Sequence, residues 1–127
     1  MIESFVKDLA QGPNFGTITT LLSDGSPATH VMWVDCDDEH VILNTETHRA
    51  KYRNILRDPR VSVVVWDANN PITYVEVRGR VVDTVTGKEA RDHIDAMSMK
   101  YDGAPYENEI QSERVILKIL PDRQRRY

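Results

Sequence analysis

The chain has 127 residues, of which 40% are hydrophobic and 28% charged, and its formal net charge is −4. This length suits one domain over residues 1–127. The acidic balance gives no reason to expect nucleic acid, the single cysteine excludes an intramolecular disulfide, and no apolar run approaches the ~20 residues of a membrane helix. Met1–Phe5 holds an early acid and no cleavable apolar core, so we expect a cytoplasmic protein.

The first part of the chain predicts a short helix and then three strands. Apolar residues at positions 2, 5, 6 and 9 lie on one helical face, and Gly12-Pro13 ends that helix. The expected strands are Phe15–Leu22, Ala28–Asp35 and Val41–Thr45, with turns at Ser23–Pro27 and Asp37–Glu39. Such short connections predict an antiparallel meander.

A change of pattern at Thr47 predicts a second helix. Tyr52, Ile55 and Leu56 have helical spacing, Thr47 is a suitable N-cap, and Pro59 prevents the helix from continuing.

Two further strands follow that helix. Val61–Trp66 is rich in β-branched residues, and Thr73–Asp83 alternates between valines and charged side chains after a loop at Asp67–Pro71. Gly79, inside the second of these strands, predicts a bulge or the close approach of another backbone.

The last part of the chain predicts a helix, a loop and a final strand. Thr86 and Glu89 fit a capping box, and Gly103 is a natural stop. The apolar face of this helix comprises Ala90, Ile94, Met97 and Tyr101. After a loop at Pro105–Ser112, alternation over Arg114–Leu120 supplies the sixth strand.

These elements predict a mainly β (α+β) fold. Six strands and about three short helices without a βαβ rhythm favour a small antiparallel barrel with helices at its ends. A barrel of this size buries little surface alone, so we expect a homodimer that covers the exposed strands.

The common catalytic and metal-binding motifs are missing. The sequence has no G-x-S-x-G, P-loop or H-E-x-x-H pattern, and its four histidines lack metal-ligand spacing. We therefore name no metal and no catalytic residue. His93 faces away from the Ile94–Met97 stripe and is expected to be exposed, while Cys36 is expected to be a small buried filler.

Arg49 and Lys51 stand in the first turn of the second predicted helix, directly after a strand. Helix N-termini carry partial positive charge and disfavour cations, so this placement suits a bound anion. Free backbone N–H groups and two basic side chains would form a phosphate cradle. The alternative is a solvated basic face on a surface helix.

Aromatic residues on the strands also allow two interpretations. Trp33, Trp66 and Tyr74 could line a flat aromatic pocket, or they could belong to the core or to a dimer interface.

Four segments of the chain resemble one family. RAKYRNILRDPRVSV at 49–63 resembles the pyridoxamine-phosphate-oxidase-like split-barrel family, and specifically its branch of probable deazaflavin-dependent (coenzyme F420) enzymes. DGSP at 24–27, TYVEVRGRVV at 73–82 and HIDAMSMKYDG at 93–103 extend the resemblance over essentially the whole chain.

The resemblance implies a six-stranded split-barrel homodimer with two cofactor sites between the subunits. Arg49 and Lys51 would hold the cofactor phosphate, and Asn54 would steady the start of the helix. The implied cofactor-binding residues are Val31, Met32, Trp33, Thr45, Arg49, Ala50, Lys51, Asn54, Ile72 and Tyr74. Val31, Met32 and Trp33 would run beside the tricyclic ring, and Ile72 and Tyr74 would come from the partner subunit.

The sequence also departs from the family pattern. Many relatives have Pro-Val-Trp where this chain has His30-Val31-Met32-Trp33, so ring contacts could shift by one residue. The basic tail after Pro121 is short and does not match the C-terminal region with which vitamin-forming oxidases hold pyridoxine phosphate. We therefore do not expect vitamin B6 synthesis.

The expected function is a deazaflavin (coenzyme F420)-dependent oxidoreductase that passes hydride from the reduced cofactor to a small organic substrate such as an enone or quinone. The alternatives are an FMN-dependent oxidoreductase, a non-catalytic flavin or deazaflavin carrier, and a barrel whose site has decayed. Arg53, Arg57 or Arg60 would meet the acidic tail of the deazaflavin coenzyme, and Tyr74 is one hypothetical proton donor.

Overall fold

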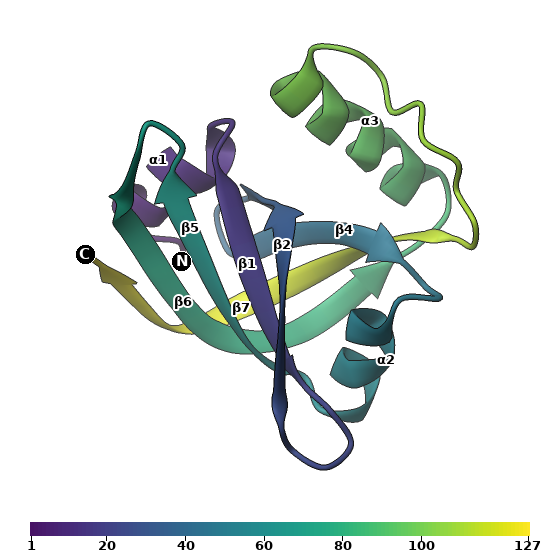
Figure 1. The fold of residues 1–127 in the computed structure, drawn as a ribbon, viewed down its shortest axis with the longest axis horizontal. Helices are drawn as coiled ribbons and strands as arrows, with labels where there is room; N and C mark the ends of the chain where they lie inside the picture. Colours follow the sequence, from purple (N-terminus) through teal and green to yellow (C-terminus); the bar gives the residue numbers. More distant parts are fainter.

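The computed structural model describes residues 1–127, which form seven strands and three helices (Figure 1). In chain order these are α1 Ser4–Gln11, β1 Phe15–Leu21, β2 Pro27–Trp33, β3 Asp35–Cys36, β4 Val41–Glu46, α2 Ala50–Arg57, β5 Arg60–Asp67, β6 Asn70–Val85, α3 Lys88–Asp102 and β7 Arg114–Arg126. None of the helices is long and apolar enough to cross a membrane.

The strands form one antiparallel sheet in the order β2-β1-β5-β6-β7-β4-β3. Figure 1 shows the sheet curling on itself, with α1 beside β5 and β6, α2 below β4, and α3 above it. Because β2 and β3 are the outermost strands, no ladder closes the barrel between them. This architecture confirms the prediction of a mainly β, antiparallel split barrel with short flanking helices.

The strand count differs from the predicted six because the expected strand Ala28–Asp35 is divided at Val34. The backbone N–H of Val34 donates to the hydroxyl of Tyr101 at 3.0 Å instead of to a neighbouring strand. The chain then resumes pairing as β3, in which Asp35 lies opposite Ile42 of β4. A contact from a distant helix thus creates the seventh strand.

The two long strands β6 and β7 exceed their predicted bounds, since β6 spans Asn70–Val85 and β7 continues to Arg126. Their pairing contains irregularities, one of them between Arg78 and Gly79. A Cβ atom on Gly79 would lie 2.2 Å from the carbonyl oxygen of Leu120. Both features predicted for Gly79, a bulge and a close backbone approach, are confirmed.

The predicted helix caps at Thr47 and Thr86 are wrong, although both helices exist. The N-cap of α2 is Arg49 and that of α3 is Gly87, and neither helix has a side-chain cap. Thr47 instead donates its backbone N–H to the Glu113 carbonyl at 2.9 Å, so this residue still belongs to the pairing with the chain before β7.

The core lies inside the curled sheet and consists of alternate residues of the strands together with one face of α1. Its largest fully buried side chains include Ile18, Leu43, Leu117 and Ile119. Cys36 belongs to the same cluster, as predicted. Ile94 and Met97 of α3 are also buried, which confirms the predicted apolar face of that helix and fixes α3 above β4 and β7.

Candidate functional site

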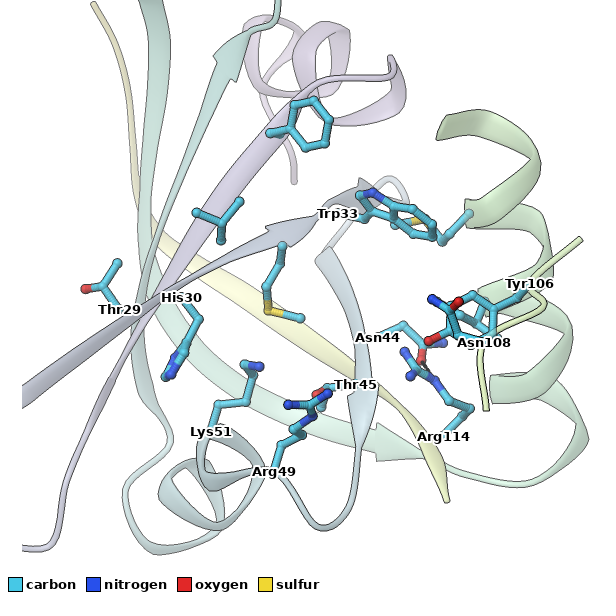
Figure 2. Close-up of a pocket in the computed structure, with 15 residues that line it drawn as sticks. Thr29, His30, Trp33, Asn44, Thr45, Arg49, Lys51, Tyr106, Asn108 and Arg114 are labelled. Carbon is cyan, nitrogen blue, oxygen red and sulfur yellow. Dashed lines mark hydrogen bonds between the residues drawn. The ribbon is translucent and has the colours of Figure 1, made fainter. Parts of the chain in front are cut away.

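A cavity of about 690 Å³ opens between β2, β4, α3 and the start of α2 (Figure 2). A volume of this size suits a cofactor or a small-molecule ligand. Its lining residues are Phe15, Thr29, His30, Val31, Met32, Trp33, Asn44, Thr45, Arg49, Lys51, Ile94, Met97, Tyr106, Asn108 and Arg114. The lining includes three basic side chains, those of Arg49, Lys51 and Arg114, and no carboxylate. The cavity therefore favours an anionic ligand.

The cations at the start of α2 have no protein partner. Neither the Arg49 guanidinium nor the Lys51 ammonium makes a side-chain hydrogen bond or an ion pair, whereas most other basic side chains of the chain do. Burial, with the charges of Arg49 and Arg114, lowers the pKa of Lys51. A cation held where its charged form is disfavoured is typical of a binding site rather than of a contact that stabilises the fold.

The local backbone explains how these two cations meet. The chain leaves β4 through a turn in which the Arg49 N–H donates to the Glu46 carbonyl at 3.0 Å, and α2 begins at Ala50 without a side-chain cap. The helix therefore presents N–H groups and its positive end beside Arg49 and Lys51. Together these groups fit a phosphate.

The opposite wall of the cavity is the outermost strand β2. Val31, Met32 and Trp33 line the cavity there, and the indole of Trp33 stacks on the Tyr101 ring with centroids 4.9 Å apart and planes 3° from parallel. Because β2 pairs only with β1, its other edge offers backbone donors and acceptors to a ligand. An apolar wall beside unpaired backbone groups fits a flat heteroaromatic ring.

The end of the cavity below α3 holds a hydrogen-bonded chain of polar side chains. The Arg114 Nε donates to the Asn44 Oδ1 at 2.8 Å, and the Asn44 Nδ2 donates to the His93 Nδ1 at 3.0 Å. The His93 Nε2 then lies 3.1 Å from the Asp35 Oδ2. Since Asn44 can only donate through its amide nitrogen, Nδ1 of His93 is the acceptor and Nε2 carries the proton.

The prediction that His93 is exposed is therefore wrong, since 14% of its side chain is accessible. A residue next to Ile94 on a helix is rotated by only about 100° from it, and this flank of α3 is covered by Asp35 and Asn44. The sequence pattern shows one helical face and not how far the neighbouring elements reach around it.

Six of the ten predicted cofactor-binding residues line the cavity, namely Val31, Met32, Trp33, Thr45, Arg49 and Lys51. Ala50 lies between the two cations as the first residue of α2. Asn54 is buried, where its Nδ2 donates to the Thr20 Oγ1 at 3.1 Å, so it ties α2 to β1 instead of contacting the cavity.

The two residues expected from the partner subunit, Ile72 and Tyr74, lie on β6 and outside the cavity of their own chain. Ile72 is 83% exposed, whereas the Tyr74 ring stacks on Tyr127 with centroids 4.7 Å apart. Of the two tryptophans, Trp33 lines the cavity, while Trp66 packs against Phe15 at 6.5 Å.

Nine lining residues were not predicted: Phe15, Thr29, His30, Asn44, Ile94, Met97, Tyr106, Asn108 and Arg114. Most come from distant segments that only the sheet and α3 bring together. Arg114 lies opposite Glu46 in the β4–β7 ladder, so its place next to Thr45 follows from strand register. The one usable signal was an arginine directly before the apolar run Val115–Leu117.

The basic residues further along α2 and at the start of β5 are held within the protein. The Arg53 Nη1 donates to the His48 carbonyl at 2.7 Å, and the Arg57 Nη2 donates to the Leu21 carbonyl at 2.9 Å. Arg60 pairs with Asp58 at 2.7 Å. These side chains differ in this respect from Arg49 and Lys51.

A sequence model described as pyridoxamine 5'-phosphate oxidase matches residues 2–126, almost the whole chain. The chain belongs to the pyridoxamine 5'-phosphate oxidase family. A solved structure described as an F420 reductase is 32% identical, with a TM-score of 0.84 and 98% of each chain covered. A conserved hypothetical protein from Mycobacterium tuberculosis is 28% identical, with a TM-score of 0.78, covering 100% of this chain and 84% of that one.

A pyridoxamine 5'-phosphate oxidase-related, FMN-binding protein from Nostoc punctiforme is 15% identical, with a TM-score of 0.64 over 94% of this chain and 75% of that one. At this identity the likeness shows the shared fold alone. No curated protein sequence matches the chain. The family match confirms the resemblance found in the sequence.

Proposed function

We propose that the chain is a deazaflavin-dependent reductase that binds coenzyme F420 in the cavity of Figure 2. The observation that carries this proposal is the pair of unpartnered cations, Arg49 and Lys51, at the uncapped start of α2 and facing the free edge of β2. The family match supports an oxidoreductase that uses a flavin or deazaflavin, and the 32% identical F420 reductase favours the deazaflavin.

In this proposal the chain binds and orients the cofactor. Arg49 and Lys51 hold the phosphate, and the strand segment Val31–Trp33 positions the ring. A bound reduced deazaflavin supplies hydride for an electrophilic double bond in a small substrate such as an enone or quinone. The apolar side chains of Ile94 and Met97 exclude water from that part of the cavity.

We also propose that a second copy of the chain completes the site. Val31 and Ile72 are 67% and 83% exposed, so one chain leaves apolar side chains uncovered on both β2 and β6. Covering them in a homodimer would bring Ile72 and Tyr74 of the partner subunit to the cavity. Tyr74 would then be able to deliver a proton to the product.

FMN is the second candidate cofactor, and one observation favours it. The basic side chains that would meet the acidic tail of coenzyme F420 are already bonded within the protein, to His48, Leu21 and Asp58. FMN ends at a single phosphate and needs only Arg49 and Lys51. A carrier without a substrate would bind its cofactor as tightly as an enzyme would and would differ only by showing no turnover.

A fluorescence titration with coenzyme F420 and with FMN, made on the wild type, Lys51→Ala and Lys88→Ala, tests the proposal. We expect the wild type to bind coenzyme F420 more tightly than FMN. Lys51→Ala should weaken binding by about ten- to a hundredfold, because a charge-assisted contact to phosphate is lost. Lys88→Ala removes an equal charge that is already paired with Asp92 at 2.6 Å and lies outside the cavity, so it should leave the Kd nearly unchanged.

Tighter binding of FMN than of coenzyme F420 would favour an FMN-dependent oxidoreductase. Equal losses in Lys51→Ala and Lys88→Ala, or no binding of either cofactor, would contradict a phosphate site at the start of α2. Tight binding of coenzyme F420 without turnover of any enone or quinone would favour the carrier.

A further inference from the structure

We propose that Arg114 forms a second anion-binding subsite below α3, which takes the carboxylate of a planar, unsaturated organic acid. This inference rests on the proposed function, because it names the class of substrate that would lie beside the bound ring. In Figure 2 the polar groups form two clusters, one with Arg49 and Lys51 at α2 and one with Arg114, Asn44, Asn108 and Tyr106 beside α3.

Arg114 is deeply placed and has hydrogen-bonding capacity left over. The residue is only 9% exposed, and its Nε is used by Asn44 at 2.8 Å, but neither of its terminal nitrogens makes a hydrogen bond. No fully buried side-chain nitrogen of the protein lacks a partner. The terminal nitrogens of Arg114 must therefore reach accessible space, and the space that Arg114 lines is the cavity.

The nearest carboxylate does not saturate Arg114. The Glu46 Oε2 lies 3.6 Å from the Arg114 Nη1, longer than a hydrogen bond. The other oxygen of Glu46 accepts the backbone N–H groups of Gln111 and Ser112 at 2.7 and 2.9 Å. Glu46 thus anchors the segment before β7 and partly balances the charge of Arg114, while it leaves the terminal nitrogens of the guanidinium without a hydrogen bond.

The guanidinium is also held in a fixed orientation. The Arg114 Cζ lies over the Tyr106 ring, 5.2 Å from the ring centroid. Tyr106 is fixed in turn, since its backbone N–H donates to Asp95 at 3.0 Å and its carbonyl accepts from Arg91 at 3.3 Å. Because Asn44 takes only the Nε–H, the two terminal nitrogens remain available side by side, and such a pair binds a carboxylate through two parallel hydrogen bonds.

The hydrogen-bonded chain behind Arg114 prevents Asn44 from turning. Asn44 gives its amide hydrogens to the Ala90 carbonyl and to His93, both at 3.0 Å, and His93 is held by Asp35. The amide oxygen must then point at Arg114. A cation oriented by a buried, fully bonded support is typical of a preorganised binding site.

The surroundings of Arg114 indicate the rest of the ligand. Ile94 and Met97 supply buried apolar surface next to it, and Trp33 adds an aromatic wall. A ligand with a carboxylate at one end and a flat hydrocarbon at the other matches this combination. Arg49 and Lys51 remain free for the phosphate, so three cations serve two anions.

An NMR titration of the ¹⁵N-labelled protein without cofactor, using cinnamate and its neutral analogue cinnamamide at matched ionic strength, tests the inference. We expect cinnamate to shift the Arg114 Nε–Hε resonance and to bind about tenfold or more tightly than cinnamamide. Cinnamamide should leave that resonance in place. The wild type alone therefore decides whether the carboxylate reaches Arg114, and no shift with cinnamate would overturn the inference.

Variants then separate the two clusters. The preference for cinnamate should disappear in Arg114→Met and persist in Lys51→Ala. It should weaken in Arg114→Lys, which keeps the charge but lacks the paired N–H groups of a guanidinium. Loss of the preference in Lys51→Ala with retention in Arg114→Met would place the carboxylate at the phosphate cradle and overturn the proposal. So would a loss of cofactor affinity in Arg114→Lys as large as in Lys51→Ala, because all three cations would then serve one phosphate.

These readouts do not depend on the proposed function. If neither coenzyme F420 nor FMN binds, the proposed function fails while the cinnamate titration still reports on Arg114. If the cofactor binds and cinnamate does not, the second subsite fails alone.

Discussion

The two sides of the barrel differ in how their close and polar contacts are satisfied. Where β5, β6 and β7 pair, the contacts are internal: Gly79 packs on the backbone of β7, and Arg78 and Arg80 pair with carboxylates at 3.2 and 2.5 Å. At the cavity, Arg49 and Lys51 have no partner. The difference indicates that the first side maintains the fold and that the second is reserved for a ligand.

The largest effect should come from breaking the packed side with Gly79→Val. The new Cβ would lie 2.2 Å from the Leu120 carbonyl oxygen, so β6 and β7 must separate. We expect the free energy of unfolding, measured in urea, to fall by about 3 kcal/mol or more. Val82→Thr, at an exposed position of the same strand, should change it by less than about 0.5 kcal/mol. A tolerated Gly79→Val would show that the bulge is not a tight contact.

A smaller loss should follow from Asn54→Ala, at the boundary between the two sides. Asn54 is 4% exposed and bonds Arg57 and the buried Thr20, so its removal leaves the Thr20 hydroxyl buried without this partner. We expect the free energy of unfolding, measured in urea, to fall by about 1–3 kcal/mol. The Kd of the cofactor, measured well below the unfolding transition, should change less than in Lys51→Ala. A larger loss of affinity than in Lys51→Ala would assign Asn54 a direct part in binding.

The sequence predicted the packed side better than the cavity. The alternation of Val75, Val77 and Val81 and the lone Gly79 identify β6 and its bulge, because periodicity and backbone freedom are local properties. In the cavity, Arg49 and Lys51 were found because they stand together at a helix start. Arg114 and Asn44 were missed because strand register, not sequence distance, brings them together.

The same reasoning explains the wrong N-cap at Thr47 and the extra strand. An N-cap preference is a local pattern, but Thr47 is held by Glu113 and the break at Val34 by Tyr101, both from distant parts of the chain. Local sequence rules fail where a tertiary contact takes the backbone group that they assign.

On the cavity side, removing a cation should stabilise the free protein. Burial, with the charges of Arg49 and Arg114, lowers the pKa of Lys51, so the charged form is disfavoured in the fold at every pH below that lowered pKa. Lys51→Met should therefore raise the free energy of unfolding near neutral pH by up to about 1 kcal/mol, measured in urea at low salt, while it weakens cofactor binding. The gain should vanish above the ordinary pKa of 10.5. A loss of stability would mean that Lys51 already has a partner.

The pKa shift of Cys36, the thiol in the core, should have the smallest effect on stability near neutral pH. Its sign is opposite to that of the shift of Lys51. Burial, with the charge of Asp35, raises the pKa of Cys36 from 9.0 to about 11, so the folded protein keeps a proton that the unfolded chain has released. The stability from Cys36 is complete below pH 9.0 and is lost as the pH rises towards 11. In urea unfolding above pH 9.0, the wild type should lose stability relative to Cys36→Val, and below it their difference should be constant. Rapid reaction of Cys36 with a thiol reagent in the folded protein would contradict this, because a reactive thiolate requires access that a side chain in the core does not have.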